Sequence, residues 1–270
     1  MIISIDGVIV PRESATVSIL DRGFLYGDGL FEILRSWDGG TPQLDLHLDR
    51  LYASAQELRM RVVERGSLKA QVDRTVEAAG GDHRVRIIVT RGEGRIAERA
   101  ASIGPGRSIV IAEPLGELQR EVSLATVEWP LPRRIGPAHK TLAYLDPLWA
   151  RELAAAAGAD EAVRLDADGH VAECATANIF VVRGGEVVTP PLDGILPGIT
   201  RACVLASCGA NGVVCQERTV SRDELRSADE IFVTSAVRGV VAVTRLDGEA
   251  RAAGPITERL AGWINARPAI

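Results

Sequence analysis

Glu173-Cys-Ala-Thr-Ala-Asn-Ile-Phe180 is followed in the chain by Val187-Val-Thr189 and then by Leu196-Pro-Gly-Ile-Thr-Arg201. These three pieces decide the fold. Asn178–Val182 and Glu186–Thr189 are rich in β-branched and apolar residues, and a Gly-Gly pair separates them. That pattern predicts two antiparallel strands joined by a tight turn.

The chain beyond this hairpin predicts a helix, two more strands and a last helix. The Pro-Gly segment leads into a helix through Cys208, with Thr200 expected as its N-cap. Farther on, Glu230–Thr234 and Val240–Thr244 have the composition of strands. Ile256–Ala266 follows as an expected helix.

The chain before the hairpin has the same character. Leu145–Ala157 is expected to be a helix, closed by Gly158 in the C-cap position. Glu161–Leu165 and Val171–Cys174 then read as a second hairpin, because the residues between them favour a turn. Short antiparallel strands with helices beside them indicate an α+β enzyme fold.

The first half alternates short strands with helices. Residues 1–10 read as strand, turn and strand, and apolar residues at helical spacing predict an amphipathic helix over His47–Arg61. Further strands are expected at Val85–Thr90, Ser108–Ala112 and Val122–Val127. The glycines of Arg91–Ala97 predict a loop, and a Pro-rich stretch spans Trp129–Pro137.

The predicted organisation is two domains. Proline, glycine and charged residues break the pattern near Pro114–Glu121. We expect a small N-terminal α/β domain over residues 1–116, a linker over 117–121 and a larger C-terminal domain over 122–270.

Composition excludes several classes of protein. The chain has 270 residues, 46% of them hydrophobic and 25% charged, and 31 basic against 36 acidic residues give a net charge of -5. This is the profile of a globular protein with no nucleic-acid partner and no membrane partner. The N-terminus lacks the features of a signal peptide, so a cytoplasmic location is expected. The four cysteines show no zinc-ligand spacing, so we expect them to be reduced and mostly buried, and no metal ion.

The three quoted pieces resemble the signature of the class IV aminotransferases, which are fold-type IV enzymes that use pyridoxal phosphate. The resemblance extends to Tyr26-Gly-Asp-Gly-Leu-Phe-Glu32, His47-Leu-Asp-Arg-Leu51 and His139-Lys-Thr-Leu-Ala-Tyr-Leu145, and further to Gly158-Ala-Asp-Glu-Ala162 and Ala228-Asp-Glu-Ile-Phe-Val-Thr234. It therefore covers nearly the whole chain. It implies a two-domain α+β fold whose larger domain is a pseudo-barrel of short strands.

The chemistry of this cofactor requires one lysine that is deprotonated near neutral pH, since only the free amine bonds the cofactor aldehyde. Lys140 matches the family's lysine, and by the resemblance it also moves the proton between the substrate Cα and the cofactor C4′. Taken alone, Lys140 would be interpreted as a surface lysine. Only the surrounding motif reverses that interpretation.

The resemblance assigns further cofactor contacts. A carboxylate must keep the pyridine nitrogen protonated, and Glu173 is the candidate, although alone it would be a surface glutamate of a hairpin. Arg50 matches the family's phosphate-binding arginine, the alternative being an ion pair on the helix surface. The other implied contacts are backbone amides to the phosphate, a side chain against the ring face and a hydrogen bond to the phenolic oxygen, from Ile199 and Thr200, Ser235 and Ala236, Leu196, and Tyr144.

Substrate choice is expected to depend on one strand of the small domain. Phe31, Ile33 and Arg35 alternate along the chain and so share one face, which in relatives faces the active site. Branched-chain aminotransferases typically have glycine at the position of Ile33, and aminodeoxychorismate lyases have threonine. A branched aliphatic residue is what the D-amino-acid aminotransferases carry, although Ile33 also suits an ordinary core position.

The match to the family's residues for binding the substrate carboxylate is incomplete. D-amino-acid aminotransferases use an arginine and a histidine two residues apart in the loop after the Thr-Arg-Gly motif. Here Arg95 matches that arginine only across a gap, and the histidine is absent. Arg86 matches a basic position used by branched-chain enzymes and by the lyase. Arg35 is a further candidate, and so is Arg22, across a dimer interface. A pocket rich in arginine favours dicarboxylates such as 2-oxoglutarate.

The sequence therefore predicts a homodimeric transaminase with a ping-pong cycle, and D-amino-acid aminotransferase is the first expectation. Aminodeoxychorismate lyase, branched-chain aminotransferase and R-selective amine transaminase are the alternatives within the family. A protein that binds the cofactor without turnover is the alternative of another class, because it needs Arg50 and the phosphate amides but not Lys140.

Overall fold

The computed structural model describes residues 1–99, 102–129, 131 and 138–266. Contacts between residues divide it into two compact units. Unit 1 holds residues 1–117 together with His139–Tyr144, and unit 2 holds 118–138 and Leu145–Ala266, each within the described ranges. Segment 139–144 thus belongs to unit 1, although it is distant in the sequence. Most of the Pro-rich stretch, residues 130 and 132–137, lies outside the described residues.

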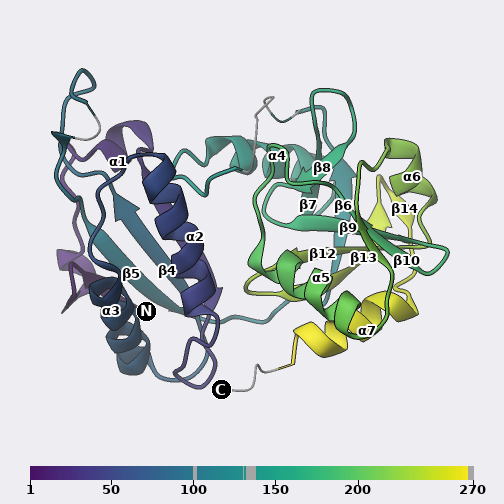
Figure 1. The fold of residues 1–270 in the computed structure, drawn as a ribbon, viewed down its shortest axis with the longest axis horizontal. Helices are drawn as coiled ribbons and strands as arrows, with labels where there is room; N and C mark the ends of the chain where they lie inside the picture. Colours follow the sequence, from purple (N-terminus) through teal and green to yellow (C-terminus); the bar gives the residue numbers. More distant parts are fainter. Residues whose placement is uncertain (100–101, 130, 132–137, 267–270) are drawn as a thin grey trace. The chain divides into compact units, whose positions relative to one another are not determined.

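Unit 1 is an antiparallel sheet covered by helices. Its elements are β1 (Ile2–Ile5), β2 (Val8–Val10), the 3-10 helix η1 (Arg12–Ser14), α1 (Arg22–Tyr26), β3 (Gly29–Arg35), α2 (Leu44–Glu57), α3 (Arg65–Ala79), β4 (His83–Thr90) and β5 (Ser108–Pro114). Among the described residues, five strands pair in the order β2-β1-β5-β4-β3. Helices α2 and α3 lie along this sheet (Figure 1). The side chains that they bury in its core are Leu44, Leu48, Leu51, Leu68, Val72 and Val76. The packing fixes the face of α2 that carries Arg50.

The helix predicted over residues 47–61 is displaced in the structure. It begins at Leu44, because Leu44 continues the buried stripe of Leu48 and Leu51, and it ends at Glu57. Arg59, two residues beyond that end, has a φ of 49°, a left-handed conformation that cannot continue a right-handed helix. Helix α3 was not specified by the sequence pattern.

Unit 2 is built around one large sheet. Its elements are β6 (Glu121–Thr126), α4 (Leu145–Ala156), β7 (Glu161–Leu165), β8 (Val171–Cys174), β9 (Asn178–Arg183), β10 (Glu186–Thr189), α5 (Ile199–Ala210), β11 (Cys215–Glu217), α6 (Arg222–Ser227), β12 (Glu230–Ser235), β13 (Gly239–Leu246), β14 (Glu249–Ala250) and α7 (Pro255–Ile264). Within the described part of the chain, the strand order is β11-β10-β9-β12-β13-β6-β7-β8, with β14 beside β13.

Alternation along the strands gives this sheet two apolar faces. Ile179 and Val181 of β9 join one buried cluster, whereas Phe180 joins another with Val204 of α5 and Leu260 of α7. Helices α5 and α7 therefore cover one face (Figure 1). The ring of Phe180 stacks on that of Phe232 in β12, with centroids 4.7 Å apart, and this packing holds α5 against the sheet.

The two predicted hairpins are confirmed. Strands β7, β8 and β10 have the predicted bounds, and β7–β8 and β9–β10 are antiparallel pairs. Gly158 follows α4 with a φ of 77°, as expected of a C-cap glycine. All four cysteines are free; Cys174 and Cys208 are buried, and Cys203 and Cys215 are half-buried. No helix in the described ranges is long and apolar enough to cross a bilayer.

Candidate active site

Lys140 lies on a short segment that runs beside the start of β3. Its carbonyl oxygen accepts a hydrogen bond from the amide of Phe31 at 2.9 Å, and the amide of Leu142 donates to the carbonyl of Gly29 at 2.9 Å. A Cβ at Gly29 would lie 2.5 Å from Leu142 Cδ1 and 2.7 Å from the carbonyl oxygen of Val89. Glycine is therefore required at this position for the lysine segment to approach the sheet.

Aromatic rings surround the amine of Lys140. Its Nζ is 4.6 Å from the ring centroid of Phe31 and 5.6 Å from that of Tyr144, and the two rings meet edge to face at 5.1 Å. The residue is half-buried. The amine therefore lies against two aromatic rings of unit 1.

The sequence contains only two lysines, Lys69 and Lys140. Lys69 lies on α3, its side chain is 42% exposed, and its Nζ pairs with Asp45 at 3.0 Å. An exposed, ion-paired ammonium is a poor nucleophile. Lys140 is therefore the lysine suited to covalent chemistry. That the chain has only two lysines could be read from the sequence alone, and it limits the candidates for a cofactor-binding lysine.

Arg50 is held by a buried carboxylate. Its Nε and Nη2 donate to Oε1 and Oε2 of Glu32 at 2.8 and 2.6 Å, a bidentate pairing. His47, one turn earlier on α2, contacts Oε2 of the same carboxylate through Nδ1 at 2.7 Å. Glu32 and His47 are 1% and 0% exposed. The structure thus places Glu32 and His47, to which the resemblance gave no role, in contact with each other and Glu32 in contact with Arg50.

The protonation states of this trio follow from its surroundings. Burial alone would raise the pKa of Glu32, but the hydrogen bonds from His47 and Arg50 together outweigh it and lower the pKa. Burial lowers the pKa of His47, against the opposing effect of Glu32. A neutral His47 must then donate through Nδ1, since a carboxylate only accepts. Its Nε2 has no hydrogen-bond partner among the described residues.

Strand β3 carries the predicted substrate residues. Phe31 is buried and Ile33 is half-buried, and Ile33 lies opposite Arg86 of β4 in the register of the sheet. The guanidinium carbon of Arg86 is 5.5 Å from the ring centroid of Phe31. These three residues are thus brought together near Lys140.

Arg35 and Arg95 make other contacts. Arg35, at the far end of β3, pairs with Asp82, and its guanidinium stacks over the ring of Trp37 at 3.6 Å. Arg95 is an exposed residue of the loop after β4, and its carbonyl oxygen accepts from Arg22 Nη1 at 2.7 Å.

In unit 2, the segment before α5 is held from two strands. Oε2 of Glu173 in β8 accepts the amide of Leu196 at 3.2 Å, and Nδ2 of Asn178 in β9 donates to the carbonyl of Leu196 at 3.0 Å. Both strands thereby fix the start of α5. Glu173 itself is half-buried and faces Arg164 across the β7–β8 pair.

The predicted N-cap of α5 is wrong. Gly198, not Thr200, is the N-cap, and the helix begins at Ile199. A Cβ at Gly198 would lie 1.9 Å from Asn178 Oδ1, so a larger residue here requires the side chain of Asn178 to move. No side chain caps this helix end. The amides of Ile199 and Thr200 are therefore not used by a side-chain cap, in the way that anion-binding helix ends require.

Ser235 and Ala236 follow at the end of β12. Both are half-buried. Nε of Arg238 approaches Ser235 Oγ at 3.5 Å, and its Nη2 is 3.9 Å from the buried carboxylate of Glu161.

Each unit, taken by itself, has residues that suit part of pyridoxal phosphate. Unit 1 offers a half-buried lysine and a cation fixed by a buried carboxylate. Unit 2 offers a helix start that excludes a side-chain cap, and the carboxylate of Glu173. In the described ranges, no three His, Cys, Asp or Glu side chains gather as metal ligands do. The chemistry of the donor set is that of a phosphate-bearing aldehyde cofactor.

Glu32 and His47 were missed as functional residues, although both lie in the quoted motifs. The signal was available in part. His47 and Arg50 are three residues apart, so they share one face of a helix. What the sequence could not supply was Glu32 as their common partner, because that contact joins a strand to a helix.

Comparisons with known proteins place these observations in a family. The family model described as amino-transferase class IV matches residues 29–246. The D-alanine aminotransferase of Bacillus licheniformis is 34% identical over 265 residues, which cover 94% of this chain and 93% of that protein.

Two solved structures carry the likeness further. The branched-chain aminotransferase of the archaeon Thermoproteus uzoniensis, solved with norvaline, is 33% identical with a TM-score of 0.89, covering 97% of this chain and 93% of that one. The 4-amino-4-deoxychorismate lyase of Pseudomonas aeruginosa is 31% identical with a TM-score of 0.86, covering 97% of each chain. The predicted α+β fold of type IV is confirmed.

Proposed function

Because this chain belongs to the class IV aminotransferases, which use pyridoxal phosphate, we propose that it transfers an amino group from a D-amino acid to a keto acid. The proposed donors are D-alanine and D-glutamate, and the proposed acceptors are 2-oxoglutarate and pyruvate. The two half-reactions alternate, so the keto acid derived from the donor leaves before the acceptor binds.

Ile33 is the observation that carries the proposed specificity. It shares a face of β3 with Phe31, whose ring centroid is 4.6 Å from Lys140 Nζ. A branched side chain at this place fills space that glycine leaves open in branched-chain enzymes. The D-alanine aminotransferase named above is among the relatives of this chain, in agreement with this assignment.

The proposed roles of the chain's residues follow from their chemistry. Bound pyridoxal phosphate supplies an aldehyde that bonds amines and a ring that delocalises the electron pair left at the substrate Cα. Lys140 provides the amine that holds the cofactor and then moves a proton between the substrate Cα and the cofactor C4′. Glu173 holds a proton on the pyridine nitrogen. Tyr144 donates to the phenolic oxygen, and Leu196 packs on the ring face.

The phosphate is proposed to bind cationic and amide donors. Arg50 supplies a guanidinium whose direction Glu32 fixes. The first amides of α5, from Ile199 and Thr200, add the partial positive charge of a helix start. Ser235 contributes its hydroxyl, whereas Ala236 contributes only its amide.

The substrate is proposed to contact the face of β3 and the nearby arginines. Phe31 and Ile33 give that face its apolar character, and Arg86 beside them provides a positive charge. Arg95, and Arg35 more remotely, are the further candidates for a substrate carboxylate. Guanidinium groups bind carboxylates with two parallel hydrogen bonds, which suits a dicarboxylic acceptor.

We propose that the protein works as a cytoplasmic homodimer. Apolar side chains that are 39–70% exposed gather in one short part of unit 1, namely Val17, Ile19, Leu20, Phe24, Leu25 and Tyr26. An exposed apolar segment of this kind is typical of a surface that a partner covers. The four free cysteines suit a reducing compartment.

Half-reaction spectra test this proposal. Purified protein with bound cofactor is mixed separately with D-alanine, D-glutamate and L-leucine, and the visible absorbance band of the cofactor is followed. Loss of the band with the D-amino acids alone supports the proposal, and loss with L-leucine alone contradicts it. Lys140→Ala is the control, because it should bind the cofactor without turnover.

Branched-chain transamination is the second candidate. Arg86 favours it, since this basic residue lies beside Phe31, 5.5 Å from its ring centroid, at a position that branched-chain enzymes and the lyase also use. A spectrum that responds to none of the three amino acids would instead make aminodeoxychorismate the next substrate to test.

A further inference from the structure

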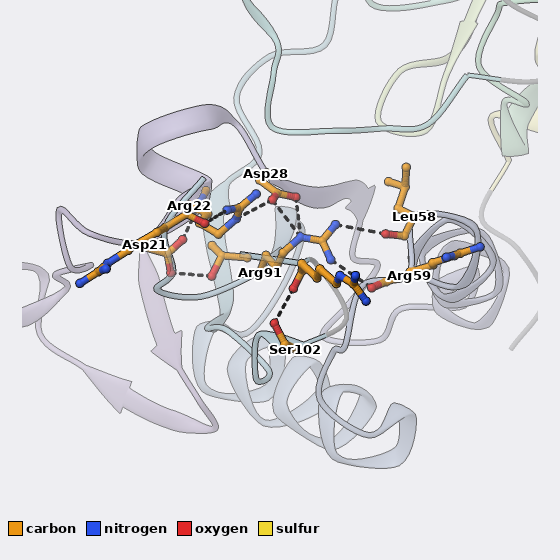
Figure 2. A network of polar contacts seen from close by, with 11 residues as sticks. Asp21, Arg22, Asp28, Leu58, Arg59, Arg91 and Ser102 are labelled. Carbon is orange, nitrogen blue, oxygen red and sulfur yellow. Dashed lines mark hydrogen bonds and ion pairs between the residues drawn. The ribbon is translucent and has the colours of Figure 1, made fainter. Parts of the chain in front are cut away.

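Asp28 joins three segments of unit 1. Its Oδ2 accepts from Arg22 Nε at 2.9 Å, and both of its carboxylate oxygens accept from Arg91 Nε at 2.8 Å. Figure 2 shows the two arginines converging on this carboxylate from opposite sides. The side chains of Arg22 and Arg91 are 11% and 6% exposed. Charge pairs so shielded from water are held more tightly than exposed ones.

Arg91 ties the aspartate to helix α2. Its Nη1 donates to the carbonyl of Arg59 at 3.1 Å and its Nη2 to that of Leu58 at 3.2 Å (Figure 2). These carbonyls lie just beyond the last turn of α2, where a helix leaves acceptors without partners. The helix that carries Arg50 is therefore fixed to Asp28 at its far end.

Arg22 ties the same aspartate to the loop after β4. Its Nη1 donates to the carbonyl of Arg95 at 2.7 Å, and its backbone amide donates to the carbonyl of Gly92 at 2.9 Å. Arg95 is exposed, and its carbonyl also accepts from the amide of Glu98 at 3.0 Å within the same loop. Asp21 forms an isolated bridge with Glu93. The guanidinium of Arg22 therefore ties the Arg95 carbonyl, and the turn that this carbonyl closes, to Asp28.

We propose that Arg22, oriented by Asp28, is a positioning residue that fixes the loop of Arg95 for the binding of a substrate carboxylate. The proposal rests on the role given to Arg95 above and goes beyond it. Two nitrogens of Arg22 are already engaged within unit 1. Arg22 then acts on substrate binding through Arg95, and its loss raises KM for a dicarboxylic acceptor while kcat changes little.

The chemistry of arginine explains why this residue type is needed. A guanidinium can donate to a carboxylate and to a carbonyl at the same time, in fixed directions. Glutamine at position 22 could keep at most one of these contacts. Lysine would keep the charge but not the planar geometry, so Arg22→Lys is expected to recover part of the function that Arg22→Gln loses.

A double-mutant cycle tests the coupling. KM and kcat for 2-oxoglutarate are measured for the protein with bound cofactor and for Arg22→Gln, Arg22→Lys, Arg95→Gln and the double variant Arg22→Gln/Arg95→Gln. Arg107→Gln is the matched control, since Arg107 forms another ion pair of unit 1 with Asp6, but at the surface. Hydrogen–deuterium exchange of residues 92–97 is recorded for each variant.

The expected result is a KM about tenfold higher for Arg22→Gln, the scale of one lost hydrogen bond from a charged donor. In the background of Arg95→Gln, the same change should have no further effect on KM. Exchange in residues 92–97 should be faster in Arg22→Gln and unchanged in Arg95→Gln and Arg107→Gln. Additive effects on KM, or unchanged exchange in Arg22→Gln, would overturn the proposal.

Failure of the proposed function gives a different pattern. If Arg95→Gln leaves KM unchanged, Arg95 does not bind the acceptor, and the positioning role is overturned even where exchange shows that Arg22 anchors the loop. If the unmodified protein transaminates none of the donors, the proposed function itself fails. The exchange data then support or overturn the anchoring on their own.

Discussion

Glu32 and Arg50 form a bidentate pair, with Arg50 Nε 2.8 Å from Oε1 and Nη2 2.6 Å from Oε2 of the carboxylate. Glu32 lies on β3 and Arg50 on α2, so the pair joins the sheet to the helix. Their hydrogen bonds, with that of His47, keep the pKa of Glu32 low although burial opposes this. The arginine proposed to bind the cofactor phosphate is thus oriented before any phosphate arrives, which reduces the ordering cost of binding.

Glu32→Gln should weaken both the fold and the binding of the cofactor. The amide removes the negative charge between Arg50 and His47, and breaking a buried ion pair costs roughly 3 kcal/mol in the free energy of unfolding. Urea denaturation measures this loss, and reconstitution of the cofactor-free protein gives the dissociation constant of pyridoxal phosphate. Glu32→Asp keeps the charge, so its free energy of unfolding and its dissociation constant should lie between those of the unmodified protein and Glu32→Gln. An unchanged dissociation constant in Glu32→Gln would show that Arg50 needs no such support.

His47→Asn should change how stability depends on pH. Burial lowers the pKa of His47, so between the folded pKa and the ordinary value of about 6.5 the unfolded chain binds more protons than the folded one. The contribution of His47 to the free energy of unfolding is therefore fully present above that ordinary value. It decreases as pH falls towards the folded pKa, by at most about 1.4 kcal/mol per pH unit. Asparagine keeps a donor near Nδ1 but does not titrate.

Denaturation between pH 7 and 5 measures this difference. The free energy of unfolding should fall less steeply in His47→Asn than in the unmodified protein. The lowered pKa of Glu32 has the same sign and acts at lower pH, where its contribution is lost as pH falls through the folded pKa. Equal slopes in the two proteins would mean that His47 titrates normally in the fold.

Gly198→Ala should disturb the start of α5. The new Cβ would lie 1.9 Å from Asn178 Oδ1, and overpacking of this kind costs about 1–3 kcal/mol. Displacing the helix start should also lower the affinity for the cofactor phosphate. Adding Asn178→Ala removes the clash and should restore part of the affinity. If the single variant binds the cofactor as well as the unmodified protein, the amides of Ile199 and Thr200 do not hold the phosphate.

Ile33→Gly should shift the choice of substrate. Removing the branched side chain beside Phe31 opens space on the substrate face, and differences of this size change specificity roughly 10–200-fold. The ratio of kcat/KM for D-alanine to that for L-leucine should decrease. Ile33→Val is the matched control, since it keeps the branched shape, and it should change the ratio little. An unaltered ratio in Ile33→Gly would assign Ile33 to the core of unit 1.

Local pattern predicted much of unit 2. The bounds of β7, β8 and β10 agree because each short strand adjoins residues that favour a turn. The end of α2 was not predicted, because it depends on a residue far away in the sequence. The left-handed Arg59 and the carbonyls beside it are stabilised by Arg91, which is distant in the sequence. Helix α3 has only a thin apolar stripe of Leu68, Val72 and Val76, and this signal was too weak to specify it.

The candidate site shows the same division. Family motifs supplied Lys140, Arg50 and Glu173, and the structure surrounds the lysine with aromatic rings. The partners of the functional residues could not be predicted from the sequence. Glu32 with Arg50, and Asp28 with Arg22, are contacts that form only once separate segments of the chain have packed together. The N-cap of α5 was predicted wrongly because threonine is a common N-cap, whereas here the N-cap is Gly198, packed against the Oδ1 of Asn178.

Lys140 is proposed to hold the cofactor covalently. Borohydride reduction of the protein with bound cofactor makes that bond permanent, and mass spectrometry of the proteolysed product identifies the residue that carries the phosphopyridoxyl group. Because the sequence has only two lysines, the measurement distinguishes directly between Lys140 and Lys69. We expect the peptide that contains Lys140 to carry the group, and no peptide of Lys140→Ala to carry it. Modification of Lys69, or bound cofactor that no lysine retains after reduction, would contradict it.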